Sequence, residues 1–329
     1  MTAAGAILRD EIRESGPIPF RRFMKVALYH PQHGYYRRKR DPFGKGGDYF
    51  TAEQVQPSFG ILIRTIVRSL MERIHGAPSG GATESLTVVE PGAGRADMAE
   101  FFREFHYVPL EYGDRMPSRF RGVVFANEFF DALPVDVAVR RGSGFRQMSV
   151  GFDNDRFHWC EGDAVCGEVA VFLNKYAGAT PENTIVEANP DALAWIEQIN
   201  QSMEAGFLLV IDYGYTAREI MRFPRGTLMS YYRHQAFDDV LADPGKRDIT
   251  AHVSFSALEQ YAASLGLERE RFETLASFLL RAGEPTQFQE VLGDLTESEA
   301  LRRRLQLKQL LFGMGETFRV LVMRKQPSS

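Results

Sequence analysis

The sequence has little cysteine, no long apolar run and no excess of one charge. Only two cysteines occur in 329 residues, Cys160 and Cys166, and they form neither a C-x-x-C pair nor a zinc-type cluster with histidine. A disulfide framework and a bound metal are therefore not expected, and the two are interpreted as ordinary thiols in a reducing compartment. No stretch approaches the roughly 18 consecutive apolar residues of a membrane-spanning helix.

The balance of charges is that of many protein classes, but it disfavours nucleic acid as the main partner. The formal net charge is −4, with 25% charged and 44% hydrophobic residues, as in an ordinary globular chain of one large α/β domain or two small ones. Without a broad basic surface, nucleic acid is not the expected partner. Residues 1–16 lack the features of a signal or transit peptide, so we expect a cytoplasmic protein with no membrane partner.

The most informative stretch is residues 86–98, LTVVEPGAGRADM, where an apolar strand ends in a carboxylate and enters a glycine turn that is expected to open a helix. Gly92 and Gly94 permit a tight bend and close backbone approach, but Asp97 stands where a dinucleotide fingerprint has its third glycine. No Gly-Lys-Ser/Thr follows, which excludes a P-loop. S-adenosylmethionine (SAM), whose charges suit a strand-end carboxylate such as Glu90, fits better, although a plain structural turn has the same pattern.

Short apolar runs alternate with helical patterns along the chain, and this alternation predicts a parallel sheet of the α/β class. The runs cover residues 86–90, 122–128, 185–189 and 206–214. Ligands of such sheets bind beyond the carboxyl ends of the strands. The polar residues at those ends are therefore candidates for a site: Glu90, Asn127, Glu128, Asn189 and Asp212. Any one of them alone is equally suited to capping a helix or closing a turn.

The rest of the chain has other periodicities. Apolar spacing predicts helices over residues 3–14, 17–29, 57–74, 254–265 and 297–312. Residues 136–160 alternate around Gly-Ser-Gly and Asp-Asn-Asp turns, which predicts an antiparallel insertion at about 136–165. Residues 317–325, TFRVLVMRK, predict a closing strand with a basic, solvent-facing end of the kind that protects sheet edges.

Several motifs taken together resemble the MidA-type methyltransferases. They occur in the family's order and are PIPFRRFMKVALYHPQHGYY, GGDYFTAEQVQPSFG, VVEPGAGRADM, FANEFFDALPVDV, LLVIDYGY, GTLMSYYRH, DITAHVSFSALE and GMGETFRVLVM. The resemblance implies a Rossmann-like class I methyltransferase core and SAM as methyl donor. It also implies a protein acceptor, as in the characterised eukaryotic member, which methylates an arginine of a respiratory complex I subunit. A helical N-terminal segment with a cofactor lid would cover residues 1–80, and the core 81–329.

Cofactor contacts follow from the resemblance position by position. Glu90, Gly92 and Gly94 would hold the methionine end of SAM, with the N-terminus of the following helix open to its carboxylate. The GGDYFT loop is implied to fold over the cofactor, where a plain surface loop is the alternative. Its candidate residues are Gly47, Asp48, Phe50 and Thr51.

Catalytic roles are implied for the motif after the second apolar run. Asn127 and Glu128 would lie beside the reacting methyl, and Asp131 follows Glu128 at i+3, on the same face of a helical turn. If arginine is the acceptor, its guanidinium, with a pKa above 12, must be held and must lose a proton as it reacts. Glu128 and Asp131 are predicted to orient it and accept that proton.

The chain departs from the family in one place. Family members have a helix and another strand between the glycine turn and the Asn-Glu motif, whereas residues 95–126 leave little room for both. Glu111 lies 17 residues after Gly94, near the roughly 20 expected for a ribose-binding acid, although Pro109 disfavours the strand that it would end. Ala-Glu also replaces the family's usual Ser-Pro after Thr51.

Other interpretations stay open at this point. A small-molecule O- or N-methyltransferase would have an enclosed, largely apolar pocket, and a non-catalytic assembly factor would keep the fold without the reaction. A homodimer is compatible with the sequence. Four tyrosines are candidates either for a cation–π slot around a cationic side chain or for packing in the core: Tyr35, Tyr36, Tyr231 and Tyr232. Histidines expected in turns or caps are His30, His33, His234 and His252.

Overall fold

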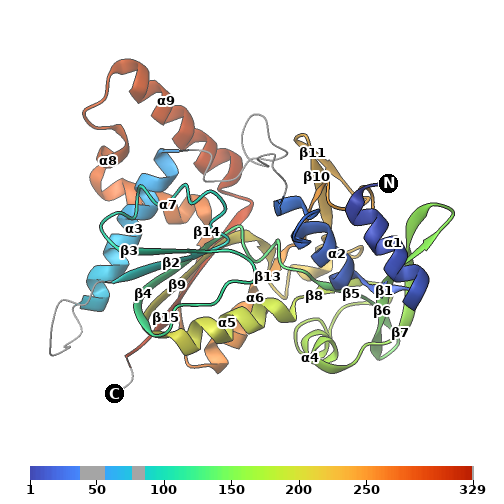
Figure 1. Ribbon diagram of the computed structural model, residues 1–329. Coiled ribbons are helices and arrows are strands. Elements are labelled where there is room, and N and C mark those ends of the chain that lie inside the picture. The colour runs from blue at the N-terminus through green and yellow to red at the C-terminus, as the bar shows by residue number, and fades with distance from the viewer. Residues whose placement is uncertain (38–55, 76–85, 328–329) are drawn as a thin grey trace. The chain divides into compact units, whose positions relative to one another are not determined.

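The computed structural model describes residues 1–37, 56–75 and 86–327, which form two compact units (Figure 1). Unit 1 comprises Met1–Phe50, Asp131–Ala194 and Tyr215–Ala257. Unit 2 comprises Thr51–Phe130, Trp195–Gly214 and Leu258–Ser329. Each unit combines residues from both of the parts predicted from the sequence, 1–80 and 81–329. The predicted division into an N-terminal segment and a core stays a prediction.

Unit 2 is built on a mixed sheet in which the strands follow the order β14-β15-β9-β4-β2-β3. Their bounds are Thr87–Pro91 (β2), His106–Leu110 (β3), Phe120–Asn127 (β4), Met203–Tyr215 (β9), Glu268–Thr274 (β14) and Phe318–Lys325 (β15). Strands β3, β2, β4 and β9 are mutually parallel, and β15 and β14 are antiparallel to their neighbours. The expected parallel core is confirmed, and its carboxyl ends lie at one edge of the sheet.

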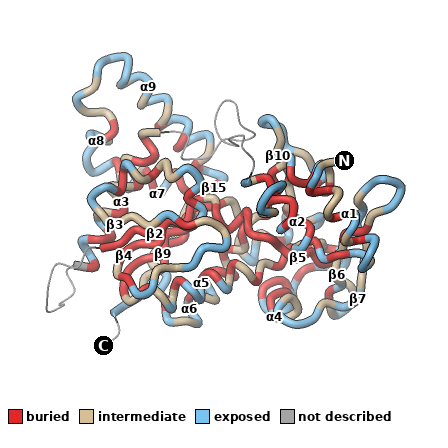
Figure 2. Tube along the Cα trace, viewed as in Figure 1, coloured by how far each residue is buried: buried red, intermediate tan, exposed pale blue. Residues whose placement is uncertain are grey.

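The helices of unit 2 pack on this sheet or on one another. They are α3 (Ser58–His75), α7 (Leu275–Gly283), α8 (Gln289–Leu292) and α9 (Glu297–Lys308), which continues into a π-helical turn, Gln309–Met314. Helices α3 and α7 contact the strands of the sheet, and α8 and α9 pack against α3. Phe59, Ile63 and Val67 of α3 are fully buried against Val123 and Phe125 of β4. Figure 2 shows strands β2, β4 and β9 as the most continuously buried part of unit 2. The helix predicted over 57–74 is thus confirmed as α3.

Unit 1 contains two antiparallel sheets. The larger follows the order β1-β6-β5-β8, with β7 beside β6, and the smaller follows β11-β10-β12. The bounds are Ile18–Pro19 (β1), Asp136–Arg141 (β5), Gly144–Asp153 (β6), Arg156–Ala164 (β7), Ile185–Ala188 (β8), Met229–Tyr232 (β10), Gln235–Phe237 (β11) and Asp248–Thr250 (β12). Asn154 and Asp155 have φ of 48° and 59°, as a two-residue hairpin turn requires. The predicted antiparallel insertion is confirmed.

Helices of unit 1 pack on these sheets, and two further helices begin in unit 1 segments and end in unit 2 segments. The first group is α1 (Ala3–Ser15), α2 (Phe20–Tyr29) and α4 (Gly167–Tyr176), with short 3₁₀ turns at Tyr35–Arg37 and Ile220–Arg222. The second group is α5 (Pro190–Ser202) and α6 (Phe255–Ser264), which directly follows β13 (Val253–Ser254). Across the described ranges, no helix is long and apolar enough to cross a membrane.

Two predicted strands are present, but their predicted places in the sheets were wrong. Residues 185–188 form β8, which pairs antiparallel with β5 in unit 1 and not with the parallel sheet. Residues 318–325 form β15, which lies between β14 and β9 and is therefore not an edge strand. The edge is β14, ERERFET, whose charged residues resemble a helix surface in sequence but also suit an exposed sheet edge.

Candidate functional site

The glycine turn at the end of β2 has a conformation that only glycine adopts easily. Gly92 and Gly94 have φ of 75° and 55°, in the left-handed region. The main-chain N–H groups of Gly92 and Ala93 both donate to Leu110 O, at 2.8 and 3.1 Å. A Cβ on Gly92 would lie 2.8 Å from Cδ2 of Phe129. The turn is thus held against the end of β3 and packed on the segment that follows β4.

The expected helix after this turn is absent, so that prediction was wrong. In the described stretch 92–105 the chain runs through successive turns, with hydrogen bonds such as Ala96 N to Ala93 O and Ala99 N to Ala96 O. Ala96 has φ of 55°, and a residue in this region interrupts a right-handed helix. A ligand carboxylate at this position would therefore meet main-chain N–H groups of turns and not a helix N-terminus.

Glu90 and Glu111 place carboxylates on either side of the glycine turn. Glu90 is 2% exposed, and the hydroxyl of Tyr107 donates to its Oε2 at 2.5 Å. Glu111 directly follows β3, and its Oε1 accepts the N–H of Gly94 at 2.7 Å. Strand β3 tolerates Pro109 because it is the sheet's edge strand. The acid expected near the ribose is therefore at a strand end beside the turn.

The predicted shortening is also visible at β3. The described residues 111–119 form neither a helix nor a strand before β4 begins. The helix and strand that the family resemblance implies between the two motifs are therefore missing, and β3 becomes the edge of the sheet.

Asn127 and Glu128 lie at the carboxyl end of β4, on the same edge as the glycine turn. Asn127 is 6% exposed, while Glu128 is half-buried. Asn127 Nδ2 donates to Glu128 Oε1 at 3.4 Å. Glu128 has φ of 50°, and its main-chain N–H donates to Ile211 O at 2.9 Å. This strained backbone turns the chain sharply away from the strand, as is common at functional sites.

Asp131 belongs to unit 1, where it forms a buried acidic pair with Asp248. They are 5% and 1% exposed, and burial, followed by the charge of Asp248, raises the pKa of Asp131 to about 8. The hydroxyl of Tyr36 donates to Asp248 Oδ1 at 2.8 Å, and Ala251 N donates to Asp131 O at 2.9 Å. Sequence reasoning did not single out Asp248, although it opens the DITAHV motif.

Other predicted residues have structural roles or lie outside the described ranges. Asn189 Oδ1 accepts Ala192 N at 2.9 Å and so caps α5. His30 Nδ1 accepts the N–H groups of Gln32 and His33 at 3.3 and 3.2 Å, as expected of a turn residue. Tyr35 is fully buried. The lid candidates lie outside the described residues: Gly47, Asp48, Phe50 and Thr51.

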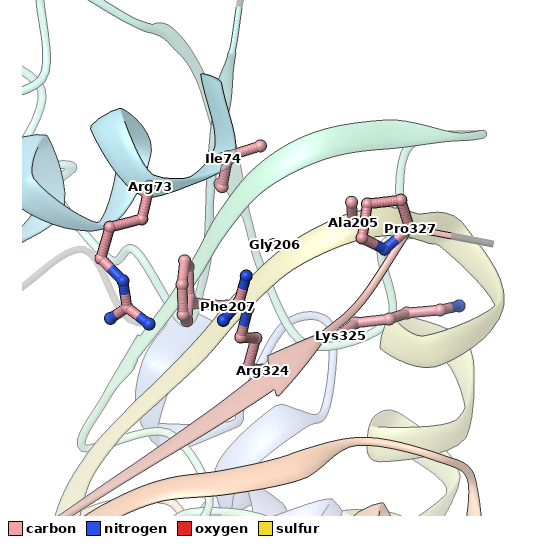
Figure 3. Close-up of a pocket in the computed structure, with 8 residues that line it drawn as sticks. All are labelled: Arg73, Ile74, Ala205, Gly206, Phe207, Arg324, Lys325 and Pro327. Atoms are coloured by element: carbon pink, nitrogen blue, oxygen red, sulfur yellow. The ribbon is translucent and has the colours of Figure 1, made fainter. Parts of the chain in front are cut away.

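A small basic pocket lies at the opposite, amino end of β9 (Figure 3). Arg73 and Arg324 lie over the ring of Phe207, 4.7 and 5.8 Å from its centroid, and Lys325 also lines the pocket. Glu270 Oε1 lies 2.5 Å from Arg73 and 3.7 Å from Arg324, and Lys325 Nζ donates to a main-chain carbonyl at 2.5 Å. The basic end of β15 is therefore held by its neighbours. The pocket is remote from the carboxyl ends of the parallel strands and forms no part of the candidate site.

The residues at the carboxyl edge of unit 2 suit SAM. The main chain is left-handed at both Gly92 and Gly94, a Cβ on Gly92 would crowd the turn, and carboxylates at Glu90 and Glu111 flank it. These groups match a cofactor with an ammonium and a ribose better than a pyrophosphate, which they would repel. Within the described ranges, no cluster of histidine, cysteine or acidic residues could hold a metal ion.

Comparison with known proteins agrees with this assignment. Residues 95–273, more than half of the chain, match a family described as "Putative S-adenosyl-L-methionine-dependent methyltransferase". The mouse protein arginine methyltransferase NDUFAF7, mitochondrial, is 27% identical over 359 residues, covering 87% of this chain and 78% of the mouse protein. Its human counterpart is 26% identical, with coverages of 94% and 81%.

Solved structures show the same relationship. A COG1565 superfamily member from Burkholderia thailandensis, bound to S-adenosyl-homocysteine, has a TM-score of 0.85 and 27% identity, covering 99% of this chain and 93% of that one. A native structure from the same organism and superfamily has a TM-score of 0.79. With a shared fold, a matching family model and a suitable cofactor site, the chain belongs to the family of S-adenosyl-L-methionine-dependent methyltransferases.

Proposed function

We propose that this methyltransferase acts on the guanidinium of an arginine in a protein, with a respiratory complex I subunit as the first acceptor to test. The support is twofold. The related mouse and human proteins are named as protein arginine methyltransferases. The observation that carries the proposal is Glu128, a half-buried carboxylate at the end of β4, beside Asn127 and on the same edge as the glycine turn.

The main contribution of the protein to this reaction is to position the methyl donor and the acceptor. SAM supplies a methyl group already activated by its sulfonium, so in-line alignment of the acceptor nitrogen can contribute about 7 to 11 kcal/mol. A guanidinium is a planar cation that pairs well with a carboxylate, and it loses a proton as its nitrogen is methylated. Glu128 is suited to both tasks because its side chain is partly accessible. No nucleophilic side chain is required.

Asp131 is less suited to accepting the proton. Burial and the neighbouring Asp248 raise its pKa to about 8, which favours the protonated form and makes Asp131 less available than Glu128 to accept a proton. We therefore assign proton acceptance to Glu128 and leave Asp131 in the buried acidic pair of unit 1. Of the two acids predicted from the sequence to accept the proton, only Glu128 is kept as the base.

The decisive experiment follows radiolabelled methyl transfer from SAM to complex I subunits, with identification of methylarginine after acid hydrolysis. We expect label in arginine, and loss of label when the acceptor arginine is replaced by lysine. Glu128→Gln should abolish transfer while S-adenosylhomocysteine affinity stays within about threefold. Unchanged turnover in this variant would remove Glu128 from the proposal.

Two other results would redirect the assignment. Cofactor binding with transfer only to small molecules would favour an O- or N-methyltransferase, and no cofactor binding would favour a non-catalytic assembly factor. Homodimer formation and the cytoplasmic location are further proposals, to be tested by light scattering and by fractionation of the source cells. The named relatives are described as mitochondrial.

A further inference from the structure

Helix α9 and the π-helical turn after it carry large apolar side chains on two opposite faces. The inner side chains are buried in the core of unit 2: Leu307, Leu310 and Leu311. The outer side chains Leu301, Leu305 and Phe312 are 58%, 59% and 79% exposed. A spacing of four residues places Leu301 and Leu305 in line along α9, and together with Phe312 of the π-helical turn they form the outer stripe. A helix that is apolar on both faces normally has both faces covered.

The packing of α9 fixes which face is turned inward. Ser58 Oγ of α3 donates to Gln306 Oε1 at 2.8 Å, and Gln306 precedes the buried Leu307. The residues of the outer stripe are among the most exposed large apolar side chains of the described chain. Figure 2 shows the outer part of α9 as largely exposed. The outer stripe is therefore accessible to a ligand or a surface.

Cationic side chains border this stripe on both sides. On a helical projection, Arg302 lies to one side of the Leu301–Leu305 line and Arg304 and Lys308 to the other. All three are exposed, in a chain whose formal net charge is −4. A basic border around an apolar stripe is the pattern of helices that lie in a membrane interface, where the long cationic side chains reach the head groups.

We propose that the outer face of α9 binds the surface of an anionic lipid bilayer. The stripe inserts its two leucines and Phe312 at the boundary between head groups and acyl chains, while Arg302, Arg304 and Lys308 contact lipid phosphates. The face is a convex helix surface and not a groove. Pairing with α9 of a second copy is less favourable, because an antiparallel pair centred on the leucines brings the arginines of both helices together. The proposal does not depend on the acceptor of the methyl group.

The test is co-sedimentation of the full-length protein with vesicles of phosphatidylcholine, alone or mixed with phosphatidylglycerol. We expect binding to the anionic vesicles at least about tenfold tighter than to the neutral ones, and weakening at high salt. The double variant Leu305→Ser/Phe312→Ser should lose about tenfold in affinity, and Arg302→Gln/Arg304→Gln should flatten the salt dependence. Because these side chains are exposed, circular dichroism should show unchanged folding.

Matched controls replace comparable side chains elsewhere. Val171→Ser removes an apolar side chain that is 67% exposed on α4, and Arg222→Gln removes an arginine that is 73% exposed; both should bind vesicles as the parent protein does. Absence of vesicle binding, or binding unaffected by the α9 variants, would overturn the proposal. Concentration-dependent self-association that is lost in Leu305→Ser/Phe312→Ser, without vesicle binding, would assign the face to a second copy.

Discussion

Asp212 braces the segment that carries Glu128, because its Oδ2 accepts the main-chain N–H of Phe130 at 3.0 Å. Its Oδ1 accepts the N–H of Tyr213, also at 3.0 Å. The carboxylate is fully buried near the carboxyl end of β9. A residue that the sequence offers as a ligand for the cofactor therefore has both oxygens committed to backbone, and its role is to position the turn after β4.

Replacing Asp212 should separate this bracing role from chemistry. We expect Asp212→Ala to lower the free energy of unfolding by about 1 to 3 kcal/mol, because it leaves the N–H of Phe130 buried without its acceptor. Asp212→Asn keeps one carbonyl oxygen and should lose less. Urea denaturation measures both. Methyl transfer should fall in the same order as stability, and full activity in Asp212→Ala would show that the turn needs no brace.

Gly92→Ala should damage cofactor binding beyond the general cost of a left-handed residue. The added Cβ would lie 2.8 Å from Phe129 at a φ of 75°. Gly266→Ala is the matched control, since Gly266 has φ of 90° but nothing within 4 Å of its Cβ position. Both variants should lose about 1 to 2 kcal/mol of stability. Only Gly92→Ala should lose about tenfold or more in S-adenosylhomocysteine affinity, measured by calorimetry. Equal affinities in the two variants would contradict a cofactor site at this glycine turn.

Glu111 should matter for affinity and not for turnover at saturating SAM. Its carboxylate holds the N–H of Gly94 at 2.7 Å, and a charged hydrogen bond of this kind contributes about 1.5 to 3 kcal/mol. Glu111→Ala should therefore weaken S-adenosylhomocysteine binding by about 10- to 100-fold, and Glu111→Gln by less. Glu104→Ala, which removes an exposed carboxylate of the same unit, is the control. A KM for SAM unchanged in Glu111→Ala would contradict the assignment.

The sequence predicted the parallel core, the antiparallel insertion and the cofactor because each has a local signature. Apolar runs such as GVVFANE become buried strands, and the glycine turn needs residues without a Cβ at Gly92 and Gly94. Strand partners are not local. IVEA of β8 reads as a core strand, yet it pairs with β5, and only tertiary packing decides which sheet a short apolar run joins.

The errors at the site have the same origin. The pattern after Gly94 has helical apolar spacing, but Ala96 takes a left-handed conformation. Alanine is not a residue type that predicts this conformation. Asp212 and Glu128 look alike as strand-end acids, but the Asp212 carboxylate accepts a main-chain N–H whereas the Glu128 carboxylate accepts the side-chain amide of Asn127. The importance of Asp248 follows from its burial beside Asp131, a contact between residues far apart in sequence.

The Asp131 and Asp248 pair predicts how stability depends on pH. Burial, and then the charge of Asp248, raise the pKa of Asp131 from 3.8 to about 8 in the folded protein. Between these values the folded state holds a proton that the unfolded state has lost, so the free energy of unfolding should fall as pH rises from about 4 to about 8. The contribution of this group is fully present at the acid end of the window and lost above its folded pKa.

Asp131→Asn removes the titrating group while keeping a side chain of similar size. Its stability relative to the parent protein should therefore rise with pH, with a slope of at most about 1.4 kcal/mol per pH unit. In Asp248→Asn the like charge is gone, so the pKa of Asp131 in the folded protein should fall and the upper end of the window should move to lower pH. Urea denaturation of the three proteins at intervals between pH 5 and pH 9 checks both. Parallel stability curves for the parent and Asp131→Asn would show that Asp131 is ionised in the folded protein, and the base assignment would then return to both acids.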